Sequence, residues 1–345
     1  MKKVRFGLVG CGRIADQHLN SIKKYKKRAK IVAVCDAVKK RARQTSANYK
    51  IKDWFVDYKK MLQRRDIDVV SICTPNGLHK DMAIKAAETG KHAIVEKPLA
   101  IKVKDIDEMI TAFKKNKKNL FAVLQVRHNP PIRYTKNFIA NKGLGKIYYA
   151  NLTIRWYRPS DYFKESWRGT KKLDGGSLLN QGVHYIDILQ WILGMPKAVF
   201  AQTLNLCHKI EIEDTVFAIL QLKNRGWTSI EFTLCNYPKN SECSLSITGE
   251  KGNIKIGGAA LDKIERWNVP CKREPKLEKS ISPNIYANGM YQGSCPYHFL
   301  IYKNLLDVLQ KNMKNQISGE EAKKSIQIIE AIYCSSAHEK KIRIL

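Results

Sequence analysis

The sequence lacks any long apolar run. Among its 345 residues, no uninterrupted apolar stretch approaches the roughly 20 residues that a transmembrane helix requires. The N-terminal segment begins like a signal peptide, but Arg13 and Asp16 break its apolar stretch and no small-residue cleavage site follows. These absences argue against a membrane span and against export, so we expect a cytoplasmic protein.

The sequence also has no Cys-x-x-Cys pair, although it contains nine cysteines. Their scattered positions argue against zinc ribbons and redox dithiols, and we expect no metal site. Several cysteines lie in apolar segments, as in Val34-Cys35 and Ile72-Cys73. There they are typical of small buried hydrophobic residues in a reducing cytosol.

Acidic residues are scarce relative to basic ones. Sixty-two Lys and Arg residues outnumber 31 Asp and Glu residues, which leaves a formal net charge of +31. Such a charge attracts nucleic acid, anionic lipid surfaces and anionic small molecules alike. The basic runs at Lys23–Arg28 and Lys114–Lys118 fall where helix C-termini are expected, and no zinc finger or aromatic RNA-binding signature accompanies them. A solvated, lysine-rich surface therefore explains the charge better than a nucleic-acid partner does.

The first 120 residues alternate between strand and helix patterns. Short β-branched runs predict strands at Val4–Val9, Ile31–Cys35, Val69–Cys73, His92–Val95 and Leu120–Gln125. Amphipathic stretches predict helices at Arg13–Tyr25, Lys39–Asn48, Leu78–Thr89 and Lys104–Phe113. Alternating strands and helices, with nearly continuous apolar strands, predict a doubly wound parallel α/β sheet that is covered on both faces.

The pattern changes after Pro130-Pro131. Long strand-like stretches joined by hairpin-like turns, such as Gly249–Gly252, predict a large and mostly antiparallel open sheet. A helix near Leu178–Leu193 interrupts these strands, and two more helices close the chain. We therefore predict two domains, a doubly wound α/β domain of residues 1–126 and a second α/β domain of residues 127–345.

A dinucleotide-binding pattern follows the first predicted strand. The segment Gly10-Cys11-Gly12-Arg13-Ile14-Ala15 is a Gly-x-Gly-x-x-Ala motif that opens a helix. Its glycines allow a tight turn and bring backbone N–H groups close to a pyrophosphate, and Ala15 keeps the helix near the strand. Asp36 ends the second strand and is placed to hold the adenosine ribose hydroxyls, which favours NAD, whereas the basic residues 39–41 leave NADP possible. The predicted cofactor-binding residues here are Gly10, Gly12, Arg13, Ile14 and Asp36.

Two further strands end at proline-containing segments. Cys73-Thr74-Pro75-Asn76 and Val95-Glu96-Lys97-Pro98 both lie at the carboxyl edge of the predicted parallel sheet, where open α/β sheets bind ligands. Lys97 is therefore predicted to be a cation directed into the expected cleft. The alternative is a solvated ion pair between Glu96 and Lys97.

The sequence resembles the Gfo/Idh/MocA (glucose–fructose oxidoreductase/inositol dehydrogenase) family over essentially its whole length. The resemblance rests on the glycine motif, on Thr74-Pro75-Asn76 with His79, on Glu96-Lys97-Pro98-Leu99, and on Gly175–His184 with Ile186-Asp187. It implies that residues 1–126 form an NAD(P)-binding Rossmann domain and that residues 127–345 form a substrate-binding and oligomerisation α/β domain. The sheet of the second domain commonly carries the contacts of a homodimer or homotetramer, and its C-terminal helices can pack back on the first domain. It also implies hydride transfer between NAD(P) and a sugar or cyclitol hydroxyl. The cofactor contacts implied in this way are Thr74, Pro75, Asn76, His79, Glu96 and Lys97.

His184 is the best candidate base for that chemistry. Oxidation of a secondary alcohol needs a base for the hydroxyl proton and positive charge near the developing alkoxide. An imidazole suits proton transfer near neutral pH, and in the family the matching histidine does this beside the lysine of the Glu-Lys-Pro motif. We therefore predict Lys97 and His184 as the catalytic residues. Many family members carry Asp where this chain has Asn180, which cannot take a proton, and Asp187 either orients His184 or forms a local ion pair.

The predicted substrate contacts are cationic and aromatic. Arg127, at the end of the last strand of the first domain, can grip a carboxylate or phosphate, or can lie in solvent or at a domain interface. Trp167 and Arg168 suit a sugar or nucleotide, or can anchor their loop by packing. These three residues, with Lys97, Asn180 and His184, form the predicted substrate site. Within the family, they favour an acidic or phosphorylated sugar. The segment 167–194 is similar to nucleotide-sugar oxidoreductases of polysaccharide biosynthesis, which implies an acidic, nucleotide-linked sugar, for example a UDP-N-acetylhexosaminuronate oxidised at C3.

Three other functions stay open on the sequence. Inositol and free-aldose dehydrogenases share the same motifs. Some family relatives use bound NAD to hydrolyse glycosides through a transient oxidation. A non-enzymatic NAD-sensing or nucleic-acid-binding regulator would suit the charge of +31, but a regulator needs neither Lys97 nor His184.

Overall fold

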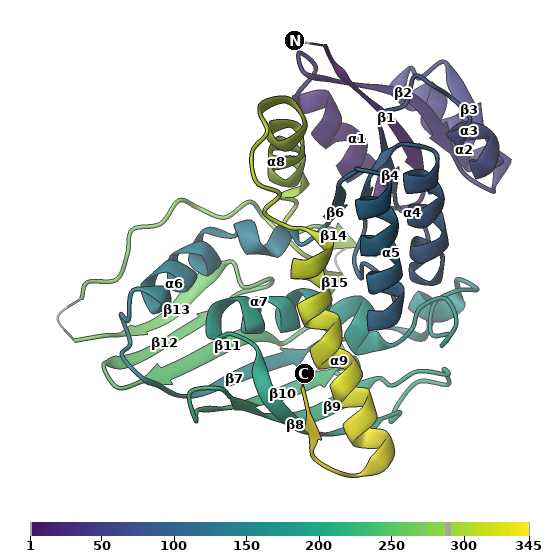
Figure 1. The fold of residues 1–345 in the computed structure, drawn as a ribbon. Coiled ribbons are helices and arrows are strands. Elements are labelled where there is room, and N and C mark those ends of the chain that lie inside the picture. The colour runs from purple at the N-terminus through teal and green to yellow at the C-terminus, as the bar shows by residue number, and fades with distance from the viewer. Residues whose placement is uncertain (1, 271, 287–290, 345) are drawn as a thin grey trace. The chain divides into compact units, whose positions relative to one another are not determined.

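The structure is a computed structural model that describes residues 2–270, 272–286 and 291–344. The chain divides into unit 1, formed by Met1–Leu124 and His298–Lys323, and unit 2, formed by Gln125–Tyr297 and Lys324–Leu345. Each unit is built around its own large β-sheet (Figure 1). The first sheet is parallel and the second is mostly antiparallel, which confirms the predicted α/β fold class.

Unit 1 contains a six-stranded sheet in the order β3-β2-β1-β4-β5-β6. Its strands are β1 (Val4–Val9), β2 (Ala29–Cys35), β3 (Asp53–Phe55), β4 (Val69–Ile72), β5 (His92–Val95) and β6 (Leu120–Ala122). Neighbouring strands pair in parallel. The strand order reverses between β1 and β4, and the carboxyl edge at such a point is where open α/β sheets bind ligands.

Helices connect and cover these strands. They are α1 (Ala15–Lys24), α2 (Lys39–Tyr49), α3 (Tyr58–Leu62), α4 (His79–Glu88), α5 (Val103–Lys115) and α8 (His298–Lys311). Helix α1 packs on α8, and α4 packs on α5 (Figure 1). All four residues of β4 and three of the four in β5 are buried. Both faces of the sheet are therefore covered, as the continuous apolar strands predict.

The sheet of unit 1 differs from the prediction at its two edges. The strand predicted at Leu120–Gln125 ends at Ala122, because the chain turns into a 3-10 helix at Gln125–His128. At the other edge, the sequence pattern does not predict β3. Its three residues are half-buried and too few to show an alternating pattern.

Unit 2 contains an eight-stranded sheet in the order β13-β12-β11-β7-β10-β9-β8-β16. Its strands are β7 (Ile147–Arg155), β8 (Pro196–Leu204), β9 (Thr215–Leu222), β10 (Trp227–Thr233), β11 (Glu242–Gly249), β12 (Gly252–Gly257), β13 (Lys263–Asn268) and β16 (Ile342–Arg343). Strands β7 and β10 pair in parallel, and the other neighbouring strands of this sheet pair antiparallel. Strands β14 (Ile285–Tyr286) and β15 (Tyr291–Gln292) form a separate pair.

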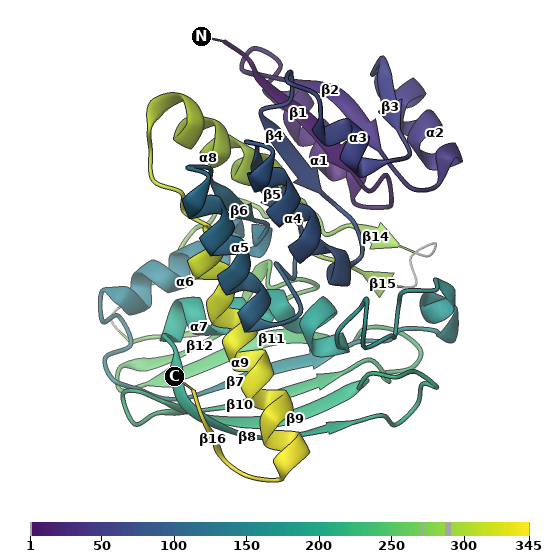
Figure 2. The ribbon, with the colours of Figure 1, turned by 45° about the vertical axis from the view of Figure 1, so that its right-hand side comes forward.

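Helices of unit 2 lie against one face of this sheet (Figure 2). They are α6 (Pro130–Ala140), α7 (Val183–Leu193) and the part of α9 (Gly319–His338) that follows Lys323. Side chains alternate along the strands, so Leu152 and Ile230 are buried in the core. The opposite face of the sheet is exposed and carries large apolar side chains such as Phe217 and Trp227.

Two cysteines are joined as a disulfide, although the sequence predicts reduced cysteines. Cys207 and Cys235 form this disulfide, with Cα atoms 6.0 Å apart and a separation of 28 positions in sequence. Cys35 and Cys73 are free and buried, as expected of small apolar side chains. The sequence does not reveal the pair, because the antiparallel pairing of β8, β9 and β10 brings the two cysteines together.

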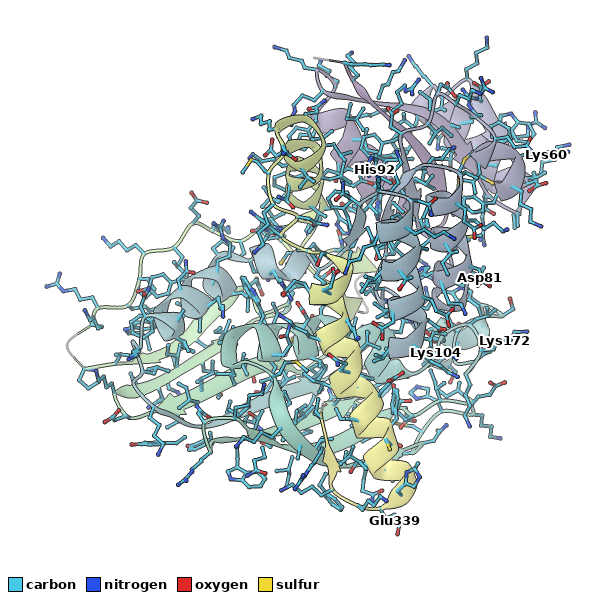
Figure 3. The ribbon with its side chains drawn as sticks, viewed as in Figure 1. Lys60, Asp81, His92, Lys104, Lys172 and Glu339 are labelled. Carbon is cyan, nitrogen blue, oxygen red and sulfur yellow. A yellow bond between two sulfur atoms is a disulfide. The ribbon has the colours of Figure 1, made fainter. Side chains whose placement is uncertain are left out.

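Basic side chains are distributed over many elements of the surface. Lys23 and Lys24 lie in the last turn of α1, and Lys114 and Lys115 lie in that of α5, where the helix dipole favours cations. The labelled residues Lys60, Lys104 and Lys172 are all exposed (Figure 3). Within the described part of the chain, no helix combines the length and apolar character needed to cross a membrane.

His92 at the start of β5 gives unit 1 a pH-dependent stability (Figure 3). The backbone N–H of Asn119 donates to its Nδ1 at 2.9 Å. Burial and, as a smaller effect, the charge of Lys118 together lower the pKa of His92 from 6.5 to about 4. The neutral ring therefore stabilises the fold fully above about pH 6.5, and this contribution, about 3 kcal/mol, is lost as the pH falls toward 4.

Replacing His92 by glutamine is expected to reduce the loss of unfolding free energy between about pH 6.5 and 4.5. Glutamine keeps an acceptor for the N–H of Asn119 but gains no proton in this range. Urea unfolding at a series of pH values measures the effect, with His338→Gln at an exposed position as the matched control. Identical pH slopes for His92→Gln and the unmodified chain would contradict this role of His92.

Candidate active site

The glycine-rich turn between β1 and α1 is built around Gly10. Its backbone N–H donates to the carbonyl of Cys35 at 2.9 Å, and its φ of +92° lies in the region that favours glycine. A Cβ atom at this position would lie 2.5 Å from the carbonyl oxygen of Cys73. Glycine is therefore required where the turn passes the ends of β2 and β4.

Gly12 and the start of α1 leave room for an anion. A Cβ atom on Gly12 would meet no atom within 4 Å. Ala15, by contrast, is 2% exposed and belongs to a core cluster with Leu8 and Leu19, so its small side chain keeps α1 close to the sheet. The turn also contains the predicted residues Arg13 and Ile14. This open turn at a helix N-terminus fits the pyrophosphate of a dinucleotide.

Asp36 lies at the end of β2, beside this turn. Its Oδ2 accepts a hydrogen bond from the N–H of Cys11, and its Oδ1 accepts one from the N–H of Val38, both at 2.8 Å. The carboxylate is 8% exposed, and these two bonds fix its position. Because a carboxylate offers about four acceptor sites, it keeps the capacity to accept from two ribose hydroxyls.

His79 connects the segments that follow β4 and β5. Its Nδ1 lies 2.8 Å from the carbonyl oxygen of Pro98, and its Nε2 lies 2.9 Å from that of Thr74. The ring is fully buried, and burial lowers its pKa. Pro75 and Asn76 continue the turn after Thr74, and Asn76 is buried. The geometry therefore favours a role for His79 in shaping this turn over the predicted direct contact with the cofactor.

Glu96 is the centre of a buried hydrogen-bond network in unit 1. Its Oε1 lies 2.9 Å from Nε2 of His18 and 3.3 Å from Nε2 of His298. The hydroxyl of Tyr302 lies 2.8 Å from the other ring nitrogen of His18. Burial alone would raise the pKa of Glu96, but the hydrogen bonds from the two imidazoles hold it well below its ordinary value. At 6% exposure, Glu96 is not the solvated ion-pair partner of Lys97 that the sequence left open.

Lys97 follows β5 at the carboxyl edge of the sheet. Its backbone N–H donates to Oε2 of Glu96 at 3.1 Å, and the Lys97–Pro98 peptide bond is cis. Lys97 is half-buried, whereas Pro98 and Leu99 after it are buried. The network around Glu96 thus fixes the backbone that carries the predicted catalytic lysine.

His184 lies near the start of α7, directly after a π-helical turn at Leu178–Gly182. The sequence predicts one regular helix from Leu178 to Leu193, but the structure changes its period at this point. Short π-helical turns are frequent at functional sites, because they redirect the side chains that follow. Asn180 and His184 are each 5% exposed, so both predicted residues lie in a sheltered part of unit 2.

Two side chains hold the start of this π-helical turn. Oε1 of Glu213 accepts hydrogen bonds from the N–H of Leu178 at 2.7 Å and from the hydroxyl of Tyr333 at 2.8 Å. Burial raises the pKa of Glu213 to about 7, although both hydrogen bonds act in the opposite direction. A Cβ atom on Gly176 would overlap the hydroxyl of Tyr333. The second glycine of the Gly175-Gly176 pair is therefore needed for α9 to reach this turn.

Asn180 contacts a carboxylate that the sequence analysis missed. Its Nδ2 donates to Oδ1 of Asp174 at 2.5 Å, and Oδ2 of Asp174 accepts from the N–H of Gly169 at 2.8 Å. Asp174 is 1% exposed. The chain thus replaces the Asp of many family members by an amide that is backed by a buried carboxylate six residues earlier.

Arg127 and Asp187 form a buried ion pair within unit 2. Nε and one terminal nitrogen of Arg127 each donate to a different oxygen of Asp187 at 2.7 Å. The two side chains are 4% and 1% exposed. This bidentate pairing engages the guanidinium, so the geometry favours a structural role for Arg127 over the predicted grip on an anionic substrate. Asp187 therefore forms an ion pair, but with a residue 60 positions earlier in the chain and not with a local partner.

Trp167 and Arg168 belong to a half-buried cluster in their loop. Oε2 of Glu165 accepts from Nε1 of Trp167 at 3.1 Å and from Nε of Arg168 at 3.3 Å. The guanidinium of Arg168 also hydrogen-bonds the hydroxyl of Tyr162 and lies 4.2 Å from the centre of its ring. These contacts favour the loop-anchor alternative for both residues.

Sequence reasoning did not identify His18, His298 or Asp174, and only His18 lies in a sequence pattern that could have indicated its role. His18 lies on the buried face of α1 with Leu19 and Ile22, and a polar side chain on an apolar stripe indicates a buried partner. His298 and Asp174 lie in no such pattern. Their roles depend on tertiary contacts, which for His298 reach across 202 residues to Glu96.

Family models match both parts of the chain. The model described as "Oxidoreductase family, NAD-binding Rossmann fold" matches residues 4–124, and "Oxidoreductase family, C-terminal alpha/beta domain" matches residues 136–344. The chain therefore belongs to the Gfo/Idh/MocA family of oxidoreductases, as its motifs predict. Its N-terminal part is the NAD-binding Rossmann domain of that family, and the turn at Gly10 and Gly12 with Asp36 fits this cofactor.

Individual relatives match the chain over most of its length. The structure of the WlbA dehydrogenase from Bordetella pertussis, in complex with NADH and UDP-GlcNAcA, is 33% identical with a TM-score of 0.90, covering 100% of this chain and 99% of that one. The 2,7-anhydro-N-acetylneuraminate hydratase of Mediterraneibacter gnavus is 30% identical over 100% of this chain and 97% of its own length. Inositol 2-dehydrogenase of Salmonella typhimurium is 26% identical over 77% of this chain and 78% of its own.

Proposed function

We propose that the chain is an NAD-dependent dehydrogenase that oxidises a secondary hydroxyl of an acidic, nucleotide-linked sugar. The observation that carries this proposal is the similarity to the WlbA dehydrogenase, whose complex contains NADH and UDP-GlcNAcA and which matches this chain from end to end. The presence of Lys97 and His184 at the positions expected from the family motifs supports it. The substrate class is thus a UDP-N-acetylhexosaminuronate, a type of precursor used in polysaccharide biosynthesis.

Four residues carry the proposed chemistry. NAD, when bound, supplies the acceptor for the hydride. His184 accepts the proton of the substrate hydroxyl, and the ammonium group of Lys97 stabilises the negative charge that develops on its oxygen. Asn180 binds a neighbouring hydroxyl, and Asp174 holds the amide of Asn180 in place. We do not assign Arg127 or Arg168 to the substrate anion, because Asp187 and Glu165 engage their guanidinium groups.

Formation of NADH by the purified chain tests this proposal. We expect absorbance of NADH to rise with NAD and UDP-GlcNAcA, and to stay flat with UDP-GlcNAc, which has the same nucleotide but no carboxylate. Myo-inositol and free aldoses complete the panel and test the inositol and aldose alternatives. Oxidation of neutral cyclitols alone would contradict the proposed substrate class.

A redox-neutral reaction is the second candidate. It is favoured by the hydratase of Mediterraneibacter gnavus, which is 30% identical to this chain over its whole length. Hydratase or glycoside hydrolase activity that uses bound NAD transiently would form product without net NADH. Product analysis by mass spectrometry in the same assays separates this candidate from the dehydrogenase.

We further propose that the exposed face of the eight-stranded sheet joins two copies of the chain. Phe200, Phe217, Ile219, Trp227 and Tyr149 lie on this face, and each is 44–55% exposed. A contiguous apolar patch of this kind is typical of an interaction surface. Light scattering is expected to give a dimer or tetramer, and Phe217→Glu with Ile219→Glu is expected to give a monomer. A monomeric unmodified chain at micromolar concentration would contradict this interface.

The free cysteines support a reducing compartment, which we propose to be the cytoplasm. Cys11 and Cys334 are half-buried and free, and four buried cysteines are free as well. Oxidising compartments tend to pair such residues as disulfides. In a reducing compartment the disulfide between Cys207 and Cys235 is exposed to reduction.

A further inference from the structure

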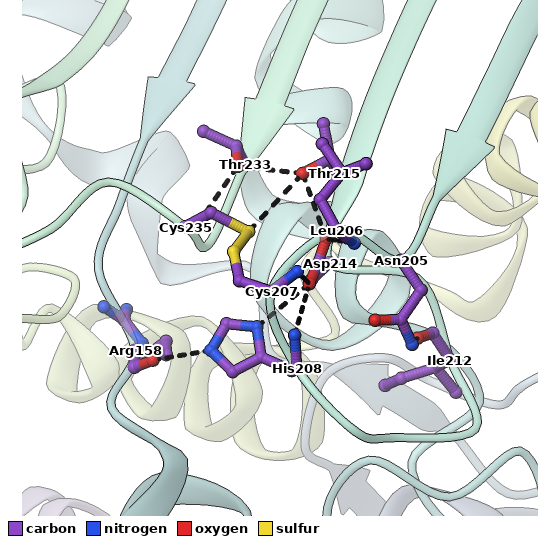
Figure 4. Close-up of a disulfide and its surroundings, with 10 residues drawn as sticks. All are labelled: Arg158, Asn205, Leu206, Cys207, His208, Ile212, Asp214, Thr215, Thr233 and Cys235. Atoms are coloured by element: carbon purple, nitrogen blue, oxygen red, sulfur yellow. Dashed lines mark hydrogen bonds and ion pairs between the residues drawn. A yellow bond between two sulfur atoms is a disulfide. The ribbon is translucent and has the colours of Figure 1, made fainter.

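Unit 2 contains a second cluster of reactive side chains at one end of its sheet. Cys207 and His208 lie in the loop between β8 and β9, Asp214 directly precedes β9, and Cys235 follows β10. Each residue offers one atom that can bind a metal, and these four atoms lie within 4.8 Å of one another (Figure 4). In the structure the two sulfur atoms are joined as a disulfide.

The orientation of His208 directs one ring nitrogen to this cluster. Its Nε2 lies 2.8 Å from the carbonyl oxygen of Arg158, an acceptor to which only an N–H group can hydrogen-bond. In a ring with one hydrogen, that hydrogen lies on Nε2, and Nδ1 then presents a lone pair to Oδ2 of Asp214 at 3.0 Å (Figure 4). Two lone pairs at this distance repel each other unless a proton or a metal cation lies between them. Histidines that bind metals usually have this arrangement, with the second ring N–H donating to a carbonyl or carboxylate.

Asp214 is fixed by the loop that contains the first two residues of the cluster. Its oxygens accept hydrogen bonds from the backbone N–H groups of Leu206 and Cys207 at 2.9 Å and of His208 at 3.0 Å. The side chain of Thr215 adds a further hydrogen bond at 3.1 Å. Outer contacts of this kind orient a carboxylate that binds a metal, and a metal on Oδ2 would replace one of them, because four donors already fill the acceptor sites of the carboxylate.

A reducing compartment would convert the disulfide to two thiols. Two molecules of a low-molecular-weight thiol, R–SH, supply two electrons and two protons; the S–S bond breaks, two cysteine thiols form, and one R–S–S–R is released. In a reducing compartment, cysteines that converge with a histidine more often bind a metal or act in catalysis than form a structural disulfide. The six free cysteines elsewhere in the described residues agree with such a compartment.

We propose that the reduced chain binds one Zn²⁺ through Cys207, His208, Asp214 and Cys235. Two thiolates, one imidazole and one carboxylate complete a four-coordinate tetrahedral shell, and zinc readily takes all three ligand types. Each thiol loses its proton when the metal binds. The shell leaves no open position for substrate, so the metal is structural. No metal site is expected from the sequence alone, because these ligands are dispersed over positions 207 to 235 and include no Cys-x-x-Cys pair.

The metal would stabilise a loop that braces the segment containing Trp167 and Arg168. The N–H of Glu211 donates to the carbonyl of Gly169 at 3.0 Å, and a carboxylate oxygen of Glu211 accepts from the N–H of Lys171 at 2.9 Å. The bond from His208 to the carbonyl of Arg158 holds the start of the same segment. Zinc is therefore expected to raise the thermal stability of the chain, whatever substrate the enzyme takes.

Cobalt(II) spectroscopy on the full chain tests the site. The protein is reduced with a thiol, the thiol is removed under anaerobic conditions, and the protein is titrated with Co²⁺. The absorption spectrum of Co²⁺ depends on its ligands and on its coordination geometry. We expect a thiolate-to-cobalt charge-transfer band and intense tetrahedral d–d bands that saturate at one Co²⁺ per chain. Zn²⁺ is expected to displace the cobalt and to raise the unfolding temperature, and a chelator is expected to reverse this rise.

Matched variants separate metal binding from disulfide formation. His208→Gln keeps both cysteines and the ability to form the disulfide, and we expect it to weaken Co²⁺ binding by at least about 100-fold. Cys334→Ser removes a cysteine that lies 3.6 Å from another histidine, His338, and is expected to bind Co²⁺ like the unmodified chain.

Three outcomes would overturn the zinc site. Two reactive thiols without cobalt bands would mean that a proton, and not a metal, lies between His208 and Asp214. Cobalt bands that persist when both Cys207 and Cys235 are changed to serine would place the metal elsewhere. A disulfide that survives the thiol reductant would make the pair a permanent crosslink. None of these readouts depends on the proposed enzyme activity.

Discussion

Replacing His184 by alanine is expected to lower kcat for oxidation of UDP-GlcNAcA by about 10²–10⁴-fold, the contribution typical of a general base. Without the imidazole, the hydroxyl proton has no acceptor of suitable basicity at neutral pH. The Kd for NADH is expected to stay within about twofold, because the residues that fit the cofactor belong to unit 1 and His184 belongs to unit 2. Steady-state kinetics and NADH fluorescence titration measure the two effects separately.

Two further variants test whether the loss of kcat is due to proton transfer at His184. His338→Ala changes an exposed histidine of α9 and is expected to leave kcat unchanged. Lys97→Met removes the ammonium group but keeps most of the side-chain volume, and is expected to lower kcat as well. If both residues act on one proton transfer, the double variant loses less activity than the product of the two single losses. Full turnover by His184→Ala would remove His184 from the catalytic role.

The sequence predicts a strand or helix correctly where the local pattern of apolar residues is sufficient to define it. Strands β4 and β5 are buried along their length, so their apolar runs are continuous and bounded by Pro75 and Pro98. Strand β3 has three half-buried residues, and its place at the sheet edge comes from pairing with β2. The π-helical turn before His184 was likewise not predictable, because the residue pattern of Leu178–Gly182 does not specify which backbone hydrogen bonds form there.

The residues of the candidate site likewise fall into those that a local pattern predicts and those whose role depends on distant contacts. The cofactor residues follow local rules: a glycine turn after a strand and an acid at the end of the next strand, and the structure places Asp36 within 2.8 Å of the N–H of Cys11. The roles of charged residues in unit 2 depend on partners distant in sequence. Arg127 could be assigned to a substrate only while Asp187, 60 residues later, was not known to lie against it.

Exchanging Asp36 for asparagine is expected to raise the Kd for NADH by about tenfold or more. Hydrogen bonds to a charged group contribute about 1.5–3 kcal/mol each, and the neutral amide gives weaker bonds to the ribose hydroxyls. The amide oxygen can still accept from one of the two N–H groups, of Cys11 or Val38, that the carboxylate binds. Asp57→Asn is the matched control, because Asp57 also accepts from a backbone N–H, that of Lys59 at 2.8 Å, at the end of the neighbouring strand.

Asp36→Asn also distinguishes two roles of Asp36, namely binding of the adenosine ribose and stabilisation of the glycine-rich turn. A carboxylate at Asp36 repels a 2′-phosphate, and three exposed cations, Lys39, Lys40 and Arg41, follow it at the start of α2. Removing the negative charge leaves these cations to act on the phosphate alone, so the Kd for NADPH is expected to stay constant or fall while that for NADH rises. An equal rise in both values would mean that Asp36 only holds the glycine turn through Cys11. A change in their ratio requires the carboxylate to face the ribose itself.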